Sequence, residues 1–166
     1  KEKKPGKTIL MAGGGRCNFT NLDVHAENYI SHNPHFCKSA LSCYTQWDFI
    51  QLVRQYNIPY HEKTLGQLFC DNKSKDILNM LLSECEKYNA EIKLECLVDK
   101  ITKNTNALFK LHTKSMGKTA KLSCSSLVIA TGGLSIPTMG ASAFAFETAK
   151  QFNINTWPTR AGLVPF

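Results

Sequence analysis

The sequence lacks several patterns that would each place it in a well-defined class. Its longest apolar run is far shorter than the roughly 20 residues that a membrane-spanning helix needs. It has no Cys-x-x-Cys pair, and its seven cysteines are scattered without a regular framework. Such scattered cysteines are typical of reduced thiols in a cytosolic protein. We therefore expect a soluble cytoplasmic protein without disulfides.

A metal site is also poorly supported. The segment His32-x-x-His35-x-Cys37 carries side chains that can bind zinc. It has no second pair of ligands, and Pro34 interrupts it. We predict no metal site in this chain.

The net charge of +7 raises the question of a nucleic-acid partner. The lysines, however, are spread along the 166 residues, with a dense patch only at Lys1–Lys7. The sequence contains no zinc knuckle, no RNP-like string and no basic helix with interleaved aromatic residues. We expect ordinary solvated lysines and no nucleic-acid partner. A basic nucleic-acid-associated α/β protein stays open as an alternative that only the charge supports.

The stretch Lys7–Asn21 has the features of a strand that ends at a ligand. The apolar run Thr8–Ala12 has the length of a strand, and we predict a strand over Lys7–Ala12. It stops at Gly13-Gly14-Gly15, where three residues without Cβ allow positive φ and close approach of a flat ligand. Arg16 follows with a planar guanidinium that suits phosphate or a polarised ring oxygen. The alternative is a surface turn beside one solvated arginine.

A second stretch repeats this pattern. The continuous apolar run Ser126–Ala130 is typical of a strand buried on both faces of a parallel sheet. It leads directly into Thr131-Gly132-Gly133. Ligands of open α/β sheets bind outside the carboxyl ends of the strands. We therefore expect the two glycine turns to lie on the nucleotide side of one α/β unit.

Local patterns predict the remaining elements. Thr45 and Asp48 have the spacing of a capping box that begins a helix, and this helix should stop before Pro59. A small hairpin around Gly66 should follow. We further predict a long loop over Gly13–Ile30, a short helix over His32–Ser42, a β-meander over Glu91–Ser123 and a last helix over about 142–152. A long helix should run from Ser74 or Asn72 to about Tyr88, with an apolar stripe that faces the core and includes Ile77, Leu78 and Tyr88.

The strings GGGRCN-x-TN and ATGG-L-S-x-P resemble the BaiN-type (YhiN-like) NAD(P)/FAD-dependent oxidoreductases, a flavoprotein family with a two-dinucleotide-fold FAD domain. The resemblance covers essentially the whole chain. It implies an α/β fold, namely an incomplete Rossmann-like FAD/NAD(P)-binding domain with a helical segment and a β-meander. No G-x-G-x-x-G occurs in the chain. We therefore interpret residues 1–166 as a partial FAD-binding domain, without the family's first strand, inserted domain and C-terminal FAD segment.

The resemblance also implies a function. The complete protein should be an FAD-dependent oxidoreductase that transfers hydride or electrons to an unidentified small molecule, with NAD(P)H as a candidate electron donor. A nucleotide-binding module without turnover is the alternative. The chain alone should be inactive, bind FAD poorly and self-associate. No residue is a convincing general acid or general base for catalysis. His61 and Glu62 have side chains of the right type, but nothing in the sequence places them at the flavin.

The residues that the resemblance assigns to the cofactor come from three segments. The first turn should lie against the flavin and pyrophosphate, Val98 should meet the adenine through its backbone, and the second turn should lie near the ribose and phosphates. Cys17 is interpreted as a small buried residue beside the flavin, with a reactive thiol beside Arg16 as the alternative. The set is Gly13, Gly14, Gly15, Arg16, Cys17, Asn18, Val98, Ala130, Thr131, Gly132 and Gly133.

Overall fold

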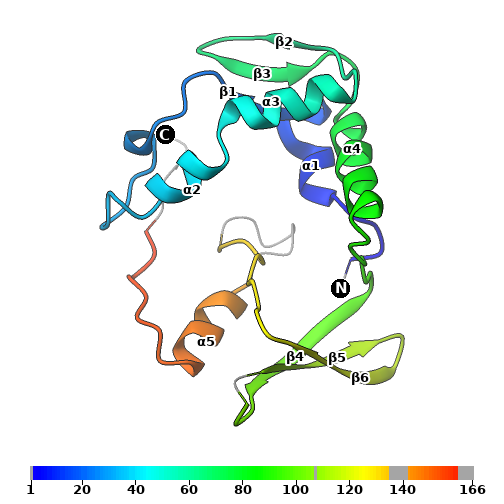
Figure 1. Ribbon diagram of the computed structural model, residues 1–166, viewed down its shortest axis with the longest axis vertical. Helices are drawn as coiled ribbons and strands as arrows, with labels where there is room; N and C mark the ends of the chain where they lie inside the picture. The colour runs from blue at the N-terminus through cyan, green and yellow to red at the C-terminus, as the bar shows by residue number, and fades with distance from the viewer. Residues whose placement is uncertain (1, 107, 135–141, 161–166) are drawn as a thin grey trace. The chain divides into compact units, whose positions relative to one another are not determined.

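The computed structural model describes residues 2–106, 108–134 and 142–160, which fold into two compact units (Figure 1). One unit is Lys4–Lys93, and the other combines Lys1–Lys3 with Leu94–Phe166. Ser135 and Pro137 of the second motif lie outside the described residues. The elements of the first unit are α1 (Lys7–Met11), η1 (Ala12–Gly15), β1 (Asn18–Asn21), η2 (Ala26–Asn28), α2 (Lys38–Cys43), α3 (Gln46–Gln55), β2 (Tyr60–Glu62), β3 (Gln67–Cys70) and α4 (Ser74–Lys87).

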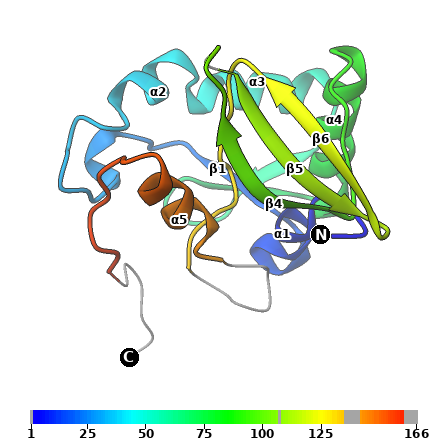
Figure 2. The same cartoon turned by 90° about the horizontal axis from the view of Figure 1, so that it is seen from below.

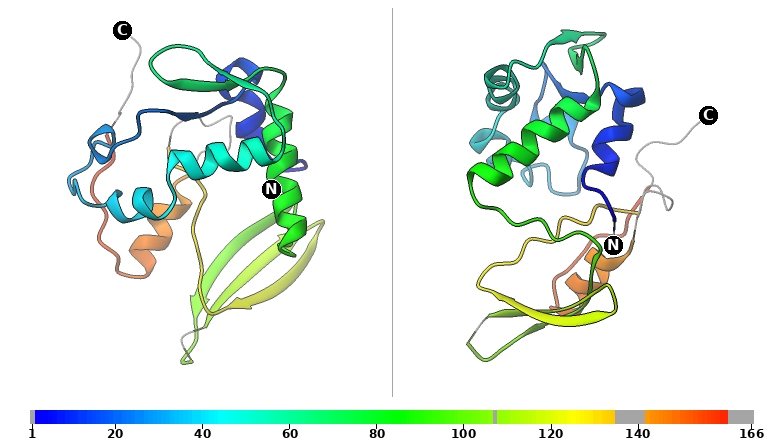
Figure 3. Two further views of the ribbon diagram at one scale, coloured as in Figure 1. Left: turned by 45° about the horizontal axis from the view of Figure 1, so that its top comes forward. Right: turned by 90° about the vertical axis from the view of Figure 1, so that its right-hand side faces the viewer.

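The segment before the triple glycine is the helix α1, so the prediction of a strand over Lys7–Ala12 was wrong. This helix lies beside α4 in Figure 1 and in the right-hand view of Figure 3. Gly6 packs against the Leu78 side chain, and the Ser74 hydroxyl donates to the Leu10 carbonyl at 3.1 Å. A short apolar run fits a helix or a strand equally well. Here α4 offers an apolar partner, and no strand in the described part of the chain pairs with this segment.

The first sheet is antiparallel, with the strand order β1-β3-β2. The predicted hairpin around Gly66 is confirmed, and Leu65 and Gly66 both take positive φ in its turn. The strand β1 was not predicted, because Asn18–Asn21 was interpreted as part of a long loop. The core of the unit lies between this sheet and the helices and consists of Cys17, Val53, Ile58, Cys70, Ile77 and Met80.

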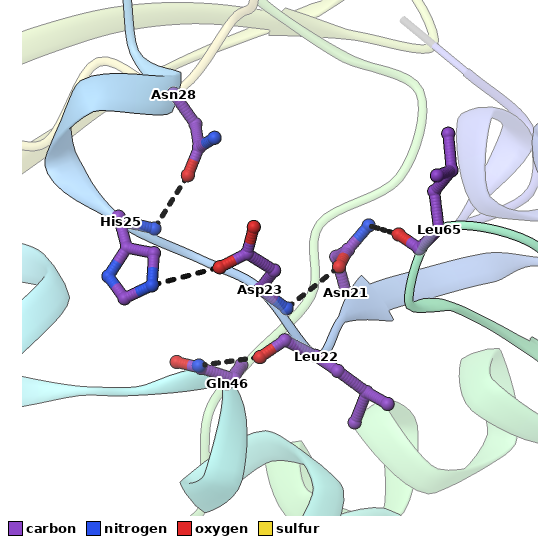
Figure 4. Close-up of polar contacts among 7 residues, drawn as sticks. All are labelled: Asn21, Leu22, Asp23, His25, Asn28, Gln46 and Leu65. Atoms are coloured by element: carbon purple, nitrogen blue, oxygen red, sulfur yellow. Dashed lines mark hydrogen bonds and ion pairs between the residues drawn. The ribbon is translucent and has the colours of Figure 1, made fainter.

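A polar network fixes the loop that follows β1 (Figure 4). The Asn21 amide donates to the Leu65 carbonyl at 2.9 Å and accepts from the Asp23 N–H at 2.8 Å. The Gln46 side chain donates to the Leu22 carbonyl at 3.2 Å, which ties the loop to the start of α3. Asn21, the last residue of the first motif, therefore holds the β2–β3 turn and the loop together.

The two long helices of this unit follow the sequence closely. Thr45 and Asp48 form the predicted capping box at the start of α3, with the Thr45 N–H donating to the Asp48 carboxylate at 2.7 Å. The helix α4 begins at Ser74 and buries Ile77 and Leu78 as expected. Tyr88 was assigned to its apolar stripe but is 69% exposed, because it lies at the C-cap. The helix α2 covers only Lys38–Cys43, the second half of the predicted segment.

The second unit contains the predicted β-meander, with the strand order β4-β5-β6 (Figure 2). Its strands are β4 (Cys96–Lys103), β5 (Phe109–Ser115) and β6 (Lys118–Cys124). The C-terminal end of the helix α5 (Phe144–Gln151) contacts this sheet. There the Phe109 and Phe152 rings meet edge to face at 5.8 Å, and the Gln151 amide donates to the Ile101 carbonyl at 2.5 Å.

The run Ser126–Ala130 is not a strand, which corrects the second strand prediction. Its central residue Val128 is 85% exposed, and no ladder in the described residues includes the run. A strand buried on both faces requires two neighbours that satisfy its backbone groups and cover its side chains. Without such neighbours the apolar composition alone does not make a strand.

Candidate functional site: the glycine turn

The triple glycine forms a left-handed turn between α1 and β1. All three residues have positive φ, at 57° for Gly13, 65° for Gly14 and 88° for Gly15. This conformation costs an L-residue about 1–2 kcal/mol, and glycine adopts it freely. The prediction that the glycines supply positive φ is therefore confirmed.

The three glycines differ in their surroundings. A Cβ on Gly13 would lie 2.7 Å from Cε1 of Phe69 and 2.8 Å from the backbone nitrogen of Asn18. A Cβ on Gly14 or on Gly15 would meet no atom within 4 Å. Gly13 is therefore required by packing inside the chain. Gly14 and Gly15 leave an open backbone surface that a flat ligand could approach.

The residues after the turn point to different roles. Arg16 is exposed, and its guanidinium has no ion pair among the residues that the structure describes, so it is available to an anionic or carbonyl ligand. Its carbonyl accepts from the Cys70 N–H at 3.1 Å, which anchors the turn to β3. The Asn18 side-chain amide is oriented so that its nitrogen faces carbonyl oxygens. In this orientation it donates to the Leu68 carbonyl at 3.2 Å and to the Thr20 carbonyl at 3.1 Å. The Asn18 side chain thus supports β1.

Cys17 belongs to the core and is only 5% exposed. Burial raises the pKa of its thiol. The neighbouring core residue Cys70 is fully buried, and burial, with smaller contributions from Cys17 and nearby carboxylates, raises its pKa to about 11. Because the thiolate is the reactive form, the alternative of a reactive Cys17 has no support here. The expected burial of Cys17 is confirmed.

A histidine–aspartate pair lies next to the residue that contacts Gly13. His61 Nδ1 lies 2.6 Å from the Asp71 carboxylate. The His61 ring stacks on Phe69 with a centroid distance of 6.4 Å, and the Lys63 ammonium lies 5.3 Å from the centre of the same ring. A carboxylate only accepts hydrogen bonds, so this contact assigns the Nδ1 proton to His61 and leaves Nε2 for proton exchange. The sequence named His61 by type but gave no sign of Asp71.

The other predicted site residues belong to the second unit. Val98 is half-buried in β4, opposite Thr113 of β5, and a β-bulge follows it. Ala130, Thr131, Gly132 and Gly133 are exposed, and Gly132 has φ of 73° with open space where a Cβ would stand. Because the two units are described separately, the meeting of both glycine turns at one ligand stays a prediction.

The comparison with known families decides the class of this chain. The family model described as the HI0933-like protein Rossmann domain matches residues 1–166. The chain belongs to this family. Its fold is therefore a Rossmann-type domain of a flavoprotein family, which agrees with the resemblance found in the sequence. The mixed α/β structure with two antiparallel sheets is the form that this domain takes over the described residues.

Two curated relatives are similar over almost the whole chain. A protein from Escherichia coli (strain K12) is 56% identical over 164 residues, and one from Haemophilus influenzae (strain ATCC 51907 / DSM 11121 / KW20 / Rd) is 51% identical over 167 residues. Each alignment covers 99% of this chain but only 40% and 41% of the relatives. Both relatives are named ribosomal RNA dihydrouridine synthase. The chain thus spans about two fifths of their length.

The turn fits the dinucleotide that a Rossmann domain implies. Gly14 and Gly15 offer backbone without side chains, and the exposed Arg16 beside them provides hydrogen-bond donors with a permanent charge. Across the described ranges, no cluster of three or more His, Cys, Asp or Glu side chains could hold a metal ion. Among the same residues, no helix is long and apolar enough to cross a membrane.

Proposed function

We propose that the complete protein containing this chain binds FAD and reduces uridine in ribosomal RNA to dihydrouridine. The observation that carries this proposal is the identity of 56% and 51% to two relatives with that name. The open glycine turn followed by an exposed arginine supports the flavin part. The name favours an RNA substrate over the small molecule expected from the sequence, and the expectation of no nucleic-acid partner remains untested.

The reaction adds two hydrogens across one carbon–carbon double bond. Saturating the C5–C6 bond of uracil takes a hydride at C6 and a proton at C5. When bound and reduced, FAD would supply the hydride and be left oxidised, and NAD(P)H is the class of reductant that would reduce it again. The chain itself must bind and orient the cofactor and bring a proton donor to the other carbon.

Residues near the turn are suited to these tasks. Gly14 and Gly15 would leave room for the cofactor, and the Arg16 guanidinium would donate to a phosphate or a flavin carbonyl oxygen. The His61–Asp71 pair is the candidate proton carrier of this unit, because the carboxylate fixes the ring and leaves Nε2 to hold the proton. Phe69 connects the two, since its ring contacts both Gly13 and His61.

The test uses the complete protein, deproteinised ribosomal RNA and NADPH. The wild-type protein should be yellow and should form dihydrouridine, detected by mass spectrometry of digested nucleosides. Arg16→Ala should weaken FAD retention by about 1.5–3 kcal/mol, the value of one hydrogen bond to a charged group. Arg54→Ala is a matched control, because this arginine lies on α3 and bonds to Tyr60.

Two results would contradict the proposal. A yellow protein that oxidises NADPH but forms no dihydrouridine in any ribosomal RNA would leave an oxidoreductase with another substrate. A protein that binds FAD without turnover would favour the nucleotide-binding module. Unchanged flavin occupancy in Arg16→Ala would remove Arg16 from the cofactor site.

A further inference from the structure

We propose that one face of the sheet β4-β5-β6 is a docking surface for the phosphate backbone of RNA. The proposal rests on the proposed function, because it names where the RNA substrate of that reaction would contact this chain. The surface, called the lysine face below, consists of Lys100, Lys110, His112, Lys114 and Lys121.

The strand register places these residues together. Alternate residues of β5 share a face, so Lys110, His112 and Lys114 point to the same side. His112 lies directly opposite Lys100 of β4 and Lys121 of β6, which adds both to that side. Figure 2 shows β5 between these two strands. The three strands thus present four lysines and one histidine on a continuous surface.

The opposite face has a different role. It carries Phe109 and Ile101, and Phe109 contacts Phe152 beyond the end of α5. This side of the sheet is therefore partly apolar and is contacted by the end of α5. The lysine face is its other side, where all four lysines are exposed and His112 is half-buried.

The charges on the lysine face are poorly compensated. Across the described residues, the ion pair of this face joins Lys114 to Asp99, with the ammonium 2.9 Å from the carboxylate. Like charges on adjacent strands destabilise a sheet. A polyanion that contacts several of the lysines would relieve this repulsion and release its own counterions. Repeated phosphates of RNA match this demand better than a single anion does.

The surface is also hollowed. A depression of about 520 Å³ is lined by residues that include Asp99, His112, Lys114, Thr119 and Lys121, with Thr113 and Ala120 completing it. Backbone contacts through lysines are independent of base sequence, so this face would position RNA while other parts of the protein select the base. This basic surface could not be predicted from the sequence, in which the lysines are dispersed. Only the register of the sheet brings them together.

The experiment measures the affinity of the complete protein for deproteinised ribosomal RNA at several salt concentrations. The test variant is Lys110→Gln/Lys121→Gln, which removes two charges from the lysine face. The control is Lys103→Gln/Lys118→Gln, which removes two charges from the other side of the same strands, where Lys118 lies opposite Ser115. Equal flavin absorbance and equal unfolding midpoints verify that both variants fold.

The expected result is specific to the lysine face. The affinity of the test variant should depend less steeply on salt than that of the wild type. The magnitude of the slope of log K against log salt should fall by about 1.4–1.8 for the two lysines, since each phosphate contact contributes about 0.7–0.9. Its affinity should fall at least fivefold, and that of the control less than twofold. Asp99→Asn should raise the affinity, because it removes the carboxylate that neutralises Lys114. Equal losses in both double variants, no loss in either, or no RNA binding by the wild type would overturn the proposal.

The two proposals fail differently. If the wild type forms dihydrouridine and the test variant binds RNA like the control, the docking surface is wrong and the reaction stands. If the wild type forms no dihydrouridine but its RNA binding depends on the lysine face, the docking surface stands and the reaction is wrong.

Discussion

Alanine substitutions at Gly13 and Gly14 should separate packing from ligand access within one turn. Both residues have positive φ, so each alanine carries the left-handed cost of about 1–2 kcal/mol. The smaller entropy of the unfolded alanine chain offsets about 0.4–1 kcal/mol of this. At Gly13 the new Cβ would also lie 2.7 Å from the Phe69 ring and 2.8 Å from the Asn18 nitrogen. Overpacking of this kind adds about 1–3 kcal/mol.

We therefore expect Gly13→Ala to lower the free energy of unfolding by about 2–4 kcal/mol and Gly14→Ala by about 1 kcal/mol or less. Urea unfolding of the flavin-free protein measures both values. Gly14→Ala should instead reduce FAD occupancy, because its Cβ projects into the space that a ligand would enter. Equal destabilisation by the two variants would refute the packing argument. Full FAD occupancy in Gly14→Ala would refute the assignment of the open surface to the cofactor.

Three further predictions concern the stability and chemistry of the first unit. Thr45→Ala should destabilise the protein by about 1 kcal/mol in urea unfolding, because it removes the side-chain cap of α3. The hydrogen bonds from Thr45 lower the pKa of Asp48 in the folded protein. The stability that these bonds give is therefore present above the ordinary carboxyl pKa, and it is lost as the pH falls through the lowered pKa of the folded state. Thr45→Ala should therefore show a weaker loss of stability in acid, and an unchanged acid profile would contradict this. Cys17 and Cys70 should resist alkylation near pH 8 while the exposed Cys43 reacts, and peptide mass spectrometry identifies the labelled sites. Rapid labelling of Cys17 in the folded protein would show that it is not an inert core residue.

The sequence predicted those elements whose signals are local. The capping box of Thr45 and Asp48, the turn at Gly66 and the stripe of α4 all depend on residues within one or two helical turns. The two failures, at Lys7–Ala12 and Ser126–Ala130, were both apolar runs interpreted as strands. A strand depends on partners far away in the sequence, and no local pattern specifies whether they are present. The segment Lys7–Met11 instead forms the helix α1 beside α4, where the Ser74 hydroxyl donates to the Leu10 carbonyl.

The candidate site could be predicted only in part for the same reason. The string GGGRCN identified the turn, and the positive φ values follow from the glycines themselves. The different roles of Gly13 and Gly14 could not be predicted, because Phe69 approaches the turn from a strand more than fifty residues later. The pairing of His61 with Asp71 likewise requires the register of β2 and β3, which places their ends together.

The Phe69 ring contacts both the glycine turn and His61. Its ring is 9% exposed and is enclosed by Gly13, His61 and Lys63. Because packed side chains leave little free space, a shift of this ring would disturb its contacts with both the glycine turn and the imidazole. The missing Cβ of Gly13 lets the ring sit close enough to join them. The first glycine of the motif thus acts inside the protein, where it makes room for the Phe69 ring that also stacks on His61.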